Sequence, residues 1–170
     1  MPEVANRVTL KGNPVTLIGN EVNIGQNAPD CTLVANDLSE FKLSSLKGKK
    51  VILSAVPSLD TPVCDIQTKR FNQEASKLGN DVKIVTISMD LPFAQKRWCA
   101  QTSSDKVITL SDHRNASFGE AYGILVKGLR LLARSIFVVD ANGTLRYKQI
   151  VNEITNEPNY EEALQAARNL

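Results

Sequence analysis

The chain has 170 residues, of which 42% are hydrophobic and 22% charged, and its formal net charge is +2. These values are typical of a globular protein that can bury a core, and they argue against a disordered or fibrous chain. Charges of both signs are interspersed, so no basic arm for nucleic acid is indicated. We interpret the densest cluster of lysines, Lys47, Lys49 and Lys50, as a solvated loop.

The N-terminus has no basic segment followed by an apolar segment, which argues against a secretory signal. No stretch of the chain approaches the roughly 18 apolar residues of a membrane span. We therefore expect a cytoplasmic protein. Because the sequence contains no internal repeat or obvious linker, we expect residues 1–170 to form a single domain.

The first part of the chain is rich in residues that form strands. Two pairs of short β-type runs come first, at residues 7–10 and 15–18 and then at residues 31–35 and 41–43. Gly12, Asn13 and Pro14 predict a turn, so the first pair is expected to be a hairpin. The apolar, β-branched run at residues 51–56 is typical of a central strand buried on both faces.

Helices and strands then alternate. Helices are expected at residues 62–78, 90–100 and 115–122, with strands at residues 82–88 and 107–110 between them. The apolar residues of the first helix have the spacing of one buried face: Ile66, Phe71, Ala75 and Leu78.

The end of the chain is predicted to hold a second hairpin and a helix. The turn sequence at residues 140–143 joins strands at residues 135–139 and 144–150. Asn159 and Glu162 resemble a capping box, which predicts a helix from there to Arg168. Taken together, the pattern predicts an α/β protein with a central mixed β-sheet flanked by helices and an N-terminal β-hairpin.

The chain has three cysteines, Cys31, Cys64 and Cys99, a low and odd number that does not suggest a disulfide scaffold. Cys64 follows Thr61, a good N-cap residue, and Pro62, which suits the first helical position. It should therefore lie in a first helical turn, where free amides and the helix dipole favour a thiolate. From position alone, a cysteine that packs beneath the turn is an equally good interpretation.

Longer motifs extend the interpretation of this segment. Residues 57–65 read PSLDTPVCD, residues 12–17 read GNPVTL, residues 88–99 read SMDLPFAQKRWC and residues 152–164 read NEITNEPNYEEAL. In this order, over nearly the whole chain, they resemble the thiol peroxidase subgroup of the peroxiredoxins. The resemblance implies a thioredoxin-like fold and reduction of hydrogen peroxide and organic hydroperoxides, with no metal, haem or flavin cofactor.

The resemblance also assigns roles to residues. Cys64 corresponds to the peroxidatic cysteine, which attacks the peroxide and becomes a sulfenic acid. Thr61 corresponds to the threonine that orients the peroxide oxygens, and Pro57 to the proline that shields the thiolate from water. Arg134 corresponds to the arginine that stabilises the thiolate and the transition state. From the residues alone, a surface cation at a strand edge is the favoured interpretation of Arg134, because Arg130 is equally available.

Cys99 is predicted near the end of the second helix, where the helix dipole disfavours a thiolate. It is thus a poor first nucleophile but an adequate partner for a sulfenic acid. By position alone, it could equally be a core cysteine beside Trp98. The resemblance implies that Cys99 is the resolving cysteine and that thioredoxin reduces the resulting disulfide with Cys64. We predict that the first turn around Cys64 and the segment around Cys99 unwind on oxidation.

Two further residues are given structural interpretations. Cys31 departs from the family pattern and is expected to be a small buried residue, with a spare redox thiol as the alternative. His113, the only histidine, is expected in a solvent-facing loop. A zinc site of Cys64, Cys99 and His113 lacks typical ligand spacing, and a Cys–His hydrolase with His113 as base is equally weakly supported.

The resemblance further implies a homodimer with a face near the active site, and the apolar stretch at residues 124–132 could be core, lid or interface. The leading hypothesis is a thioredoxin-dependent peroxidase. Its alternative is a peroxide-sensing redox relay protein, and a third possibility is a non-catalytic interaction module. Since the chain has no C-x-x-C motif, a general disulfide oxidoreductase is disfavoured.

Overall fold

A computed structural model of the chain describes residues 1–103 and 106–170. The elements up to the middle of the chain are β1 (Glu3–Leu10), β2 (Asn13–Ile18), β3 (Thr32–Val34), β4 (Glu40–Lys42), the 3-10 helix η1 (Leu43–Leu46), β5 (Lys50–Ala55), α1 (Pro62–Ala75) and β6 (Val82–Ser88). Those that follow are α2 (Pro92–Thr102), β7 (Ile108–Ser111), α3 (Ser117–Ala121), β8 (Leu125–Val126), β9 (Leu131–Leu132), β10 (Ser135–Val139), β11 (Leu145–Ile150) and α4 (Tyr160–Arg168).

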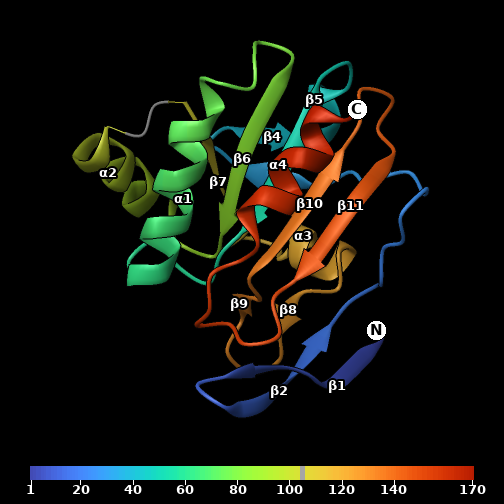
Figure 1. The fold of residues 1–170 in the computed structure, drawn as a ribbon. Coiled ribbons are helices and arrows are strands. Elements are labelled where there is room, and N and C mark those ends of the chain that lie inside the picture. Colours follow the sequence, from blue (N-terminus) through green and yellow to red (C-terminus); the bar gives the residue numbers. More distant parts are fainter. Residues whose placement is uncertain (104–105) are drawn as a thin grey trace.

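A mixed sheet forms the centre of the molecule. Within the described residues its seven strands have the order β11-β10-β5-β6-β7-β3-β4. β5, β6 and β7 are parallel; β10 pairs antiparallel with β5 and β3 with β7, and the edge strands β11 and β4 pair antiparallel with β10 and β3. Helices α1 and α4 cover one face of this sheet, and α2 lies beside α1 against β7 (Figure 1). The expected α/β fold with a central mixed sheet and flanking helices is confirmed.

Alternating residues of the central strands supply two cores, because successive side chains of a strand point to opposite faces. On one face, strand residues such as Ile52 and Ile136 pack with Phe71 of α1 and with residues of α4. On the other face, Leu53 and Phe137 belong to a larger cluster that includes α3 and the N-terminal hairpin. Burial on both faces explains why β5 is a continuous apolar run rather than an alternating one.

The expected N-terminal hairpin of β1 and β2 is present, and it belongs to a second sheet in the order β1-β2-β8-β9 (Figure 1). The apolar stretch at residues 124–132, for which the sequence left three roles open, supplies β8 and β9 of this sheet. Leu125, Val126 and Leu132 are buried in the core, whereas Leu129 in the intervening loop is exposed. The strand residues of this stretch are therefore largely core, whereas the loop at residues 127–130 is exposed.

Two predicted helix boundaries were wrong. The helix expected to reach residue 78 ends at Ala75, since the next amides bond three residues back and tighten the last turn. The helix expected at residues 115–122 is the shorter α3, because Ala116 at its N-cap has a positive φ of 51°. By contrast, the side chain of Asn159 caps α4 by accepting a hydrogen bond from the Glu162 amide, as predicted.

The predicted buried face of α1 was also partly wrong. Ile66 is 50% exposed, while the buried positions include Gln67 and Thr68 together with Cys64 and Phe71. These four have the 3–4 residue spacing of one helix face, but half of that face is polar. A pattern of apolar residues therefore could not identify it. Among the described residues, no helix combines the length and the apolar character needed to cross a membrane.

Candidate active site

The loop after β5 leads directly into α1 and places Cys64 in the first helical turn, as the sequence predicted. Pro62 occupies the first helical position and Thr61 the N-cap. The Thr61 hydroxyl does not cap the helix, however; it donates a hydrogen bond of 2.9 Å to the carbonyl oxygen of Ser58. Its side chain thus fixes the preceding loop rather than the helix amides.

Arg134 lies against the sulfur of Cys64. Its Nη2 atom donates a hydrogen bond to Cys64 Sγ over 3.2 Å, although 70 residues separate the two in the chain. Both side chains are buried, with exposed fractions of 0% for Cys64 and 2% for Arg134. A guanidinium keeps its positive charge under all ordinary conditions. A negative charge that forms on this sulfur would therefore meet a permanent cation at contact distance.

The guanidinium is held by further hydrogen bonds. Arg134 Nη1 donates to Gln67 Oε1 and Arg134 Nε donates to the carbonyl oxygen of Ile154, each over 2.8 Å. The Gln67 amide is itself oriented, since its Nε2 donates to Ser54 Oγ over 2.7 Å. Each nitrogen of the Arg134 fork thus has a defined acceptor, which fixes its plane relative to the sulfur.

A cavity of about 310 Å³ adjoins this arrangement. Pro57, Thr61 and Arg134 form part of its wall. The rest of the wall is mainly apolar and comes from the N-terminal hairpin, the start of α1, the β8–β9 region and the loop after β11; it includes Leu10, Val63, Val126, Leu129, Leu131 and Ile154. Arg134 therefore contacts both the buried sulfur and this cavity.

Cys99 lies in α2, the helix beside α1. Its sulfur is 3.4 Å from Thr109 Oγ1 of β7, and its side chain is half-buried. It packs against a small cluster that contains Cys64 and Trp98. All three cysteines of the chain are free thiols in this structure. In this thiol form, Cys64 lies within α1 and Cys99 within α2.

The two helices are also joined by polar contacts that the sequence analysis did not identify. Trp98 Nε1 donates a hydrogen bond of 2.8 Å to Asp65 Oδ1. Asp90, just before α2, accepts hydrogen bonds from the Ser58 hydroxyl and from the Leu59 amide, at 2.7 and 2.8 Å. The loop that precedes Cys64 is therefore bound to a carboxylate that stands two residues before the helix that carries Cys99.

Comparison with known proteins gives a consistent result. The family model described as Redoxin matches residues 23–164. The chain is 58% identical to a thiol peroxidase of Bacillus subtilis (strain 168) over 163 residues, which cover 96% of this chain and 97% of the relative. It is 54% identical to a thiol peroxidase of Halalkalibacterium halodurans, over 95% of this chain and 96% of the relative. The chain belongs to the Redoxin family, among the thiol peroxidases.

Solved structures agree with this membership. A peroxiredoxin-like protein from Aquifex aeolicus superposes with a TM-score of 0.90 at 41% identity, covering 97% of this chain and 98% of the other. A thiol peroxidase from Chromobacterium violaceum superposes with a TM-score of 0.84 at 17% identity, over 95% of each chain, which supports the fold alone. The expectations of a thioredoxin-like fold and of a peroxidase of the peroxiredoxin type are thereby confirmed.

The remaining cysteine of this Redoxin family member lies away from Arg134. Cys31 is buried, as predicted, and its thiol points to the carbonyl oxygens of Pro29 and Ser117, 3.8 and 3.7 Å away. Burial, reinforced by the carboxylate of Asp112, raises the pKa of the Cys31 thiol to about 12. A thiol with such a pKa stays protonated near neutral pH and is a poor nucleophile.

His113 lies in the predicted loop but is half-buried, with its Nδ1 atom 2.8 Å from the Ser111 hydroxyl. The described part of the chain contains no group of three or more histidine, cysteine or acidic side chains that could hold a metal ion. Cys64, Cys99 and His113 therefore do not form the zinc site considered above.

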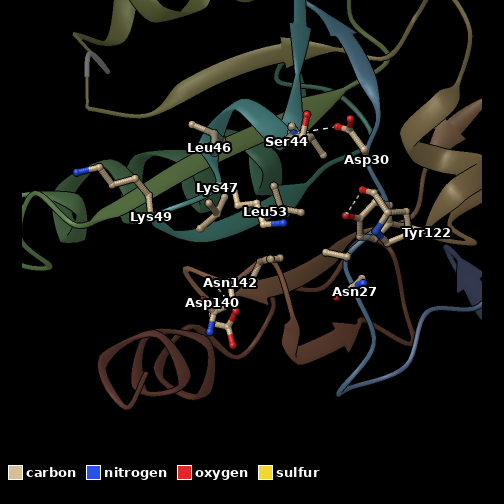
Figure 2. A pocket seen from close by; sticks show the side chains of 16 residues that line it. Asn27, Asp30, Ser44, Leu46, Lys47, Lys49, Leu53, Tyr122, Asp140 and Asn142 are labelled. Carbon is tan, nitrogen blue, oxygen red and sulfur yellow. Dashed lines mark hydrogen bonds between the residues drawn. The ribbon is translucent and has the colours of Figure 1, made fainter.

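A second cavity, of about 220 Å³, lies between the loop at residues 27–30, η1 and the β10–β11 turn (Figure 2). Figure 2 shows Asp30 bound to the backbone of Ser44, a contact of 2.9 Å, while Lys49 points away from the cavity. Lys47 and Lys49 are exposed, as expected of a solvated loop, whereas Lys50 is half-buried and begins β5. Its wall includes neither a cysteine nor Thr61 or Arg134, so it is separate from the arrangement around Cys64.

The sequence did not identify the groups that hold Arg134: Ser54, Gln67 and the carbonyl of Ile154. One signal was available for Gln67. It lies one helical turn after Cys64 and so shares its face, which a search for polar residues at that spacing would have found. A backbone carbonyl such as that of Ile154 leaves no trace in side-chain composition.

Proposed function

We propose that this Redoxin family member reduces hydrogen peroxide and organic hydroperoxides with Cys64 as the nucleophile. The observation that carries the proposal is the hydrogen bond from Arg134 Nη2 to Cys64 Sγ, 3.2 Å long, at the start of a helix. An ionised sulfur there is stabilised by a permanent cation and by the first-turn amides. The site therefore brings a nucleophile, the Cys64 sulfur, into contact with a fixed positive charge, the Arg134 guanidinium.

The Cys64 thiolate attacks one oxygen of the peroxide. An S–O bond forms as the O–O bond breaks, and the departing oxygen leaves with a proton as water or as an alcohol. The sulfur loses two electrons and becomes a sulfenic acid, while the peroxide is reduced by the same two electrons. The barrier depends on how well the negative charge on the departing oxygen is stabilised.

Residues on the cavity wall are suited to that stabilisation. Arg134 contacts both the sulfur and the cavity, so its positive charge faces the breaking bond. Thr61 lines the same cavity, and we assign its hydroxyl the task of orienting the peroxide oxygens, for which it must leave the carbonyl of Ser58. Pro57 offers an apolar ring and no N–H donor, which suits a residue that keeps water from the sulfur.

Cys99 completes the cycle in this proposal. Its thiol condenses with the sulfenic acid of Cys64, which forms an S–S bond and releases water. A dithiol reductant, for which we propose thioredoxin, then returns both cysteines to thiols. Because Cys64 and Cys99 of one chain belong to the same side-chain cluster, we propose that the disulfide is intramolecular, and that both helical segments rearrange as it forms.

The character of the cavity supports organic hydroperoxides as substrates beside hydrogen peroxide. Its wall is mainly apolar, and Leu129 on this wall is half exposed, so the alkyl part of a substrate would find hydrophobic contacts.

We also propose that the protein acts in the cytoplasm as a homodimer whose interface lies near this cavity. Sedimentation of the purified chain tests the dimer.

The function is tested by following peroxide consumption coupled to thioredoxin, with wild type, Cys64→Ser and Cys99→Ser. The proposal requires that Cys64→Ser abolish turnover. It requires that Cys99→Ser retain a single reaction with peroxide but lose recycling. Unimpaired turnover of Cys64→Ser would contradict the proposal. Fast oxidation of the wild type without thioredoxin-coupled recycling would favour the redox relay instead.

A further inference from the structure

A carboxylate far from Cys64 in the sequence binds the loop after β11 to the N-terminal hairpin. Glu153 Oε1 accepts hydrogen bonds from Thr9 Oγ1 and from the Gly12 amide, at 2.8 and 2.7 Å. Glu153 Oε2 accepts from the Lys11 amide at 3.2 Å and from the amide and hydroxyl of Thr155 at 2.8 and 2.7 Å. One side chain thus receives donors from both segments.

Backbone contacts join the same two segments. The Thr9 amide donates to the carbonyl of Asn152, and the Ile154 amide donates to the carbonyl of Thr9, each over 2.8 Å. Residue Glu153 stands between these two bonds. Its side chain therefore reinforces a short bridge between β1 and residues 152–154, to which the Thr9 hydroxyl adds a 3.5 Å hydrogen bond to the Asn152 carbonyl.

The next residue of this bridge touches the active site. The carbonyl oxygen of Ile154 accepts the hydrogen bond from Arg134 Nε, and the amide of Val151 bonds the Arg134 carbonyl over 3.0 Å. Lys11, Ile154 and Thr155 also line the cavity beside Arg134. Whatever displaces residues 151–155 must therefore displace one of the acceptors that orient the Arg134 guanidinium.

We propose that Glu153 is a positioning residue of the peroxidase site: by joining the N-terminal hairpin to residues 151–155, it fixes the Ile154 carbonyl that orients Arg134 against Cys64. The inference rests on the proposed roles of Cys64 and Arg134. It gives the N-terminal hairpin, which supplies none of the reacting groups, a defined part in the chemistry.

The state of the Glu153 carboxyl is consistent with this role. Hydrogen bonds from Thr155, first its hydroxyl and then its amide, and one from the Gly12 amide hold the pKa of Glu153 well below its usual range. The group therefore remains an ionised acceptor throughout the pH range in which peroxide reduction would be measured. An amide in its place keeps the shape but turns an NH₂ group toward donors, which breaks part of the network.

The test compares Glu153→Gln with wild type in a single reaction with hydrogen peroxide, followed over a range of pH. Glu161→Gln is the matched control, since Glu161 forms an exposed ion pair with Arg168 on α4. Thr9→Val is a milder variant that removes one donor and leaves the backbone bridge intact. Circular dichroism and thermal unfolding record how much of each variant is folded.

We expect Glu153→Gln to react about tenfold more slowly per folded molecule, because a displaced guanidinium no longer faces the reacting atoms. The pH at which the rate is half maximal should rise, since the cation beside the sulfur is less well placed. Thr9→Val should show the same change to a smaller extent, and Glu161→Gln should match wild type. A merely structural role would reduce the folded fraction without moving the pH profile.

An unchanged rate and pH profile in folded Glu153→Gln would overturn the inference. If Glu153→Gln does not fold, an unchanged profile in Thr9→Val would overturn it in the same way. Parallel reactions of Cys64→Ser and Arg134→Lys separate this result from a failure of the proposed function. Should these two react as wild type does, the proposed site itself is wrong; should they fail while Glu153→Gln is normal, only the role of Glu153 is wrong.

Discussion

Asp65 and Trp98 are joined by a hydrogen bond of 2.8 Å, so the residue after Cys64 is bound to the residue before Cys99. In the thiol form described here, the bond holds the start of α1 against α2. We predict that the two segments rearrange when a disulfide forms between Cys64 and Cys99, and this bond joins their neighbouring residues. It is therefore a barrier to the resolving step and a reporter of it.

Replacing Asp65 with alanine should accelerate disulfide formation after peroxide is added. Loss of one hydrogen bond to a carboxylate, about 1.5 kcal/mol, corresponds to a rate increase of roughly tenfold. Since Trp98 is the only tryptophan, its fluorescence can follow the step in a stopped-flow experiment. Lys69→Ala is the control, because Lys69 pairs with Asp65 Oδ2 and not with the indole. Equal rates in Asp65→Ala and Lys69→Ala would contradict the assignment.

Oxidation should expose backbone amides in two segments. The first turn of α1 and the part of α2 around Cys99 are both helical in the thiol form, and a disulfide needs Cα atoms within about 7 Å. Hydrogen exchange should therefore become faster in both segments when the protein is oxidised, while β5 and β6 stay protected. Matching exchange in the two redox states would show that the helices need not unwind.

Arg134→Lys should slow the reaction of Cys64 with peroxide by about 10²- to 10³-fold. Lysine cannot reproduce the three directed contacts of Arg134, and loss of one donor at such a site typically raises the barrier by ~3–4 kcal/mol. Arg130→Lys is a matched control on an exposed arginine only four positions earlier. Rapid-mixing kinetics that found the two variants equally slow, or equally fast, would contradict the role of Arg134.

Cys31 should resist alkylation in the folded protein near neutral pH. Burial raises its pKa to about 12, so the thiolate that reacts with iodoacetamide is scarcely formed, and mass spectrometry should find Cys31 labelled only after unfolding. The raised pKa of Cys31 also affects stability, because it means that the fold favours the neutral thiol. The stabilisation from burying this neutral thiol is present below the thiol pKa of the unfolded chain, near 8.5, and is lost as the pH rises toward 12. Unfolding measured on Cys31→Ala should lack this alkaline component.

Much of the sheet could be predicted from the sequence, because apolar β-branched runs such as Val82–Ser88 have few alternatives. The position of Cys64 in a first helical turn could be predicted as well, since Thr61 and Pro62 are strong local signals for a helix start. These features depend on residues that are neighbours in the chain.

Contacts between distant segments could not be predicted from local patterns. Arg130 and Arg134 were equally available from the sequence, but Arg134 is buried in the connection between β9 and β10, whereas Arg130 is exposed in the turn between β8 and β9. The sequence analysis predicted Ile66 on the buried face of α1, but the polar residue Gln67 is buried there instead. A search for apolar residues could not detect this. The acceptor chain from Ser54 through Gln67 to Arg134 exists only once β5, α1 and β10 are packed together.

The central claim is that peroxide first oxidises the sulfur atom of Cys64. The most direct measurement treats reduced Cys99→Ser protein with about one equivalent of hydrogen peroxide in the presence of a sulfenic-acid trapping reagent and maps the adduct by mass spectrometry. We predict the adduct on Cys64, with Cys31 unmodified. An adduct on Cys31, or none on Cys64 while peroxide is still consumed, would contradict the account.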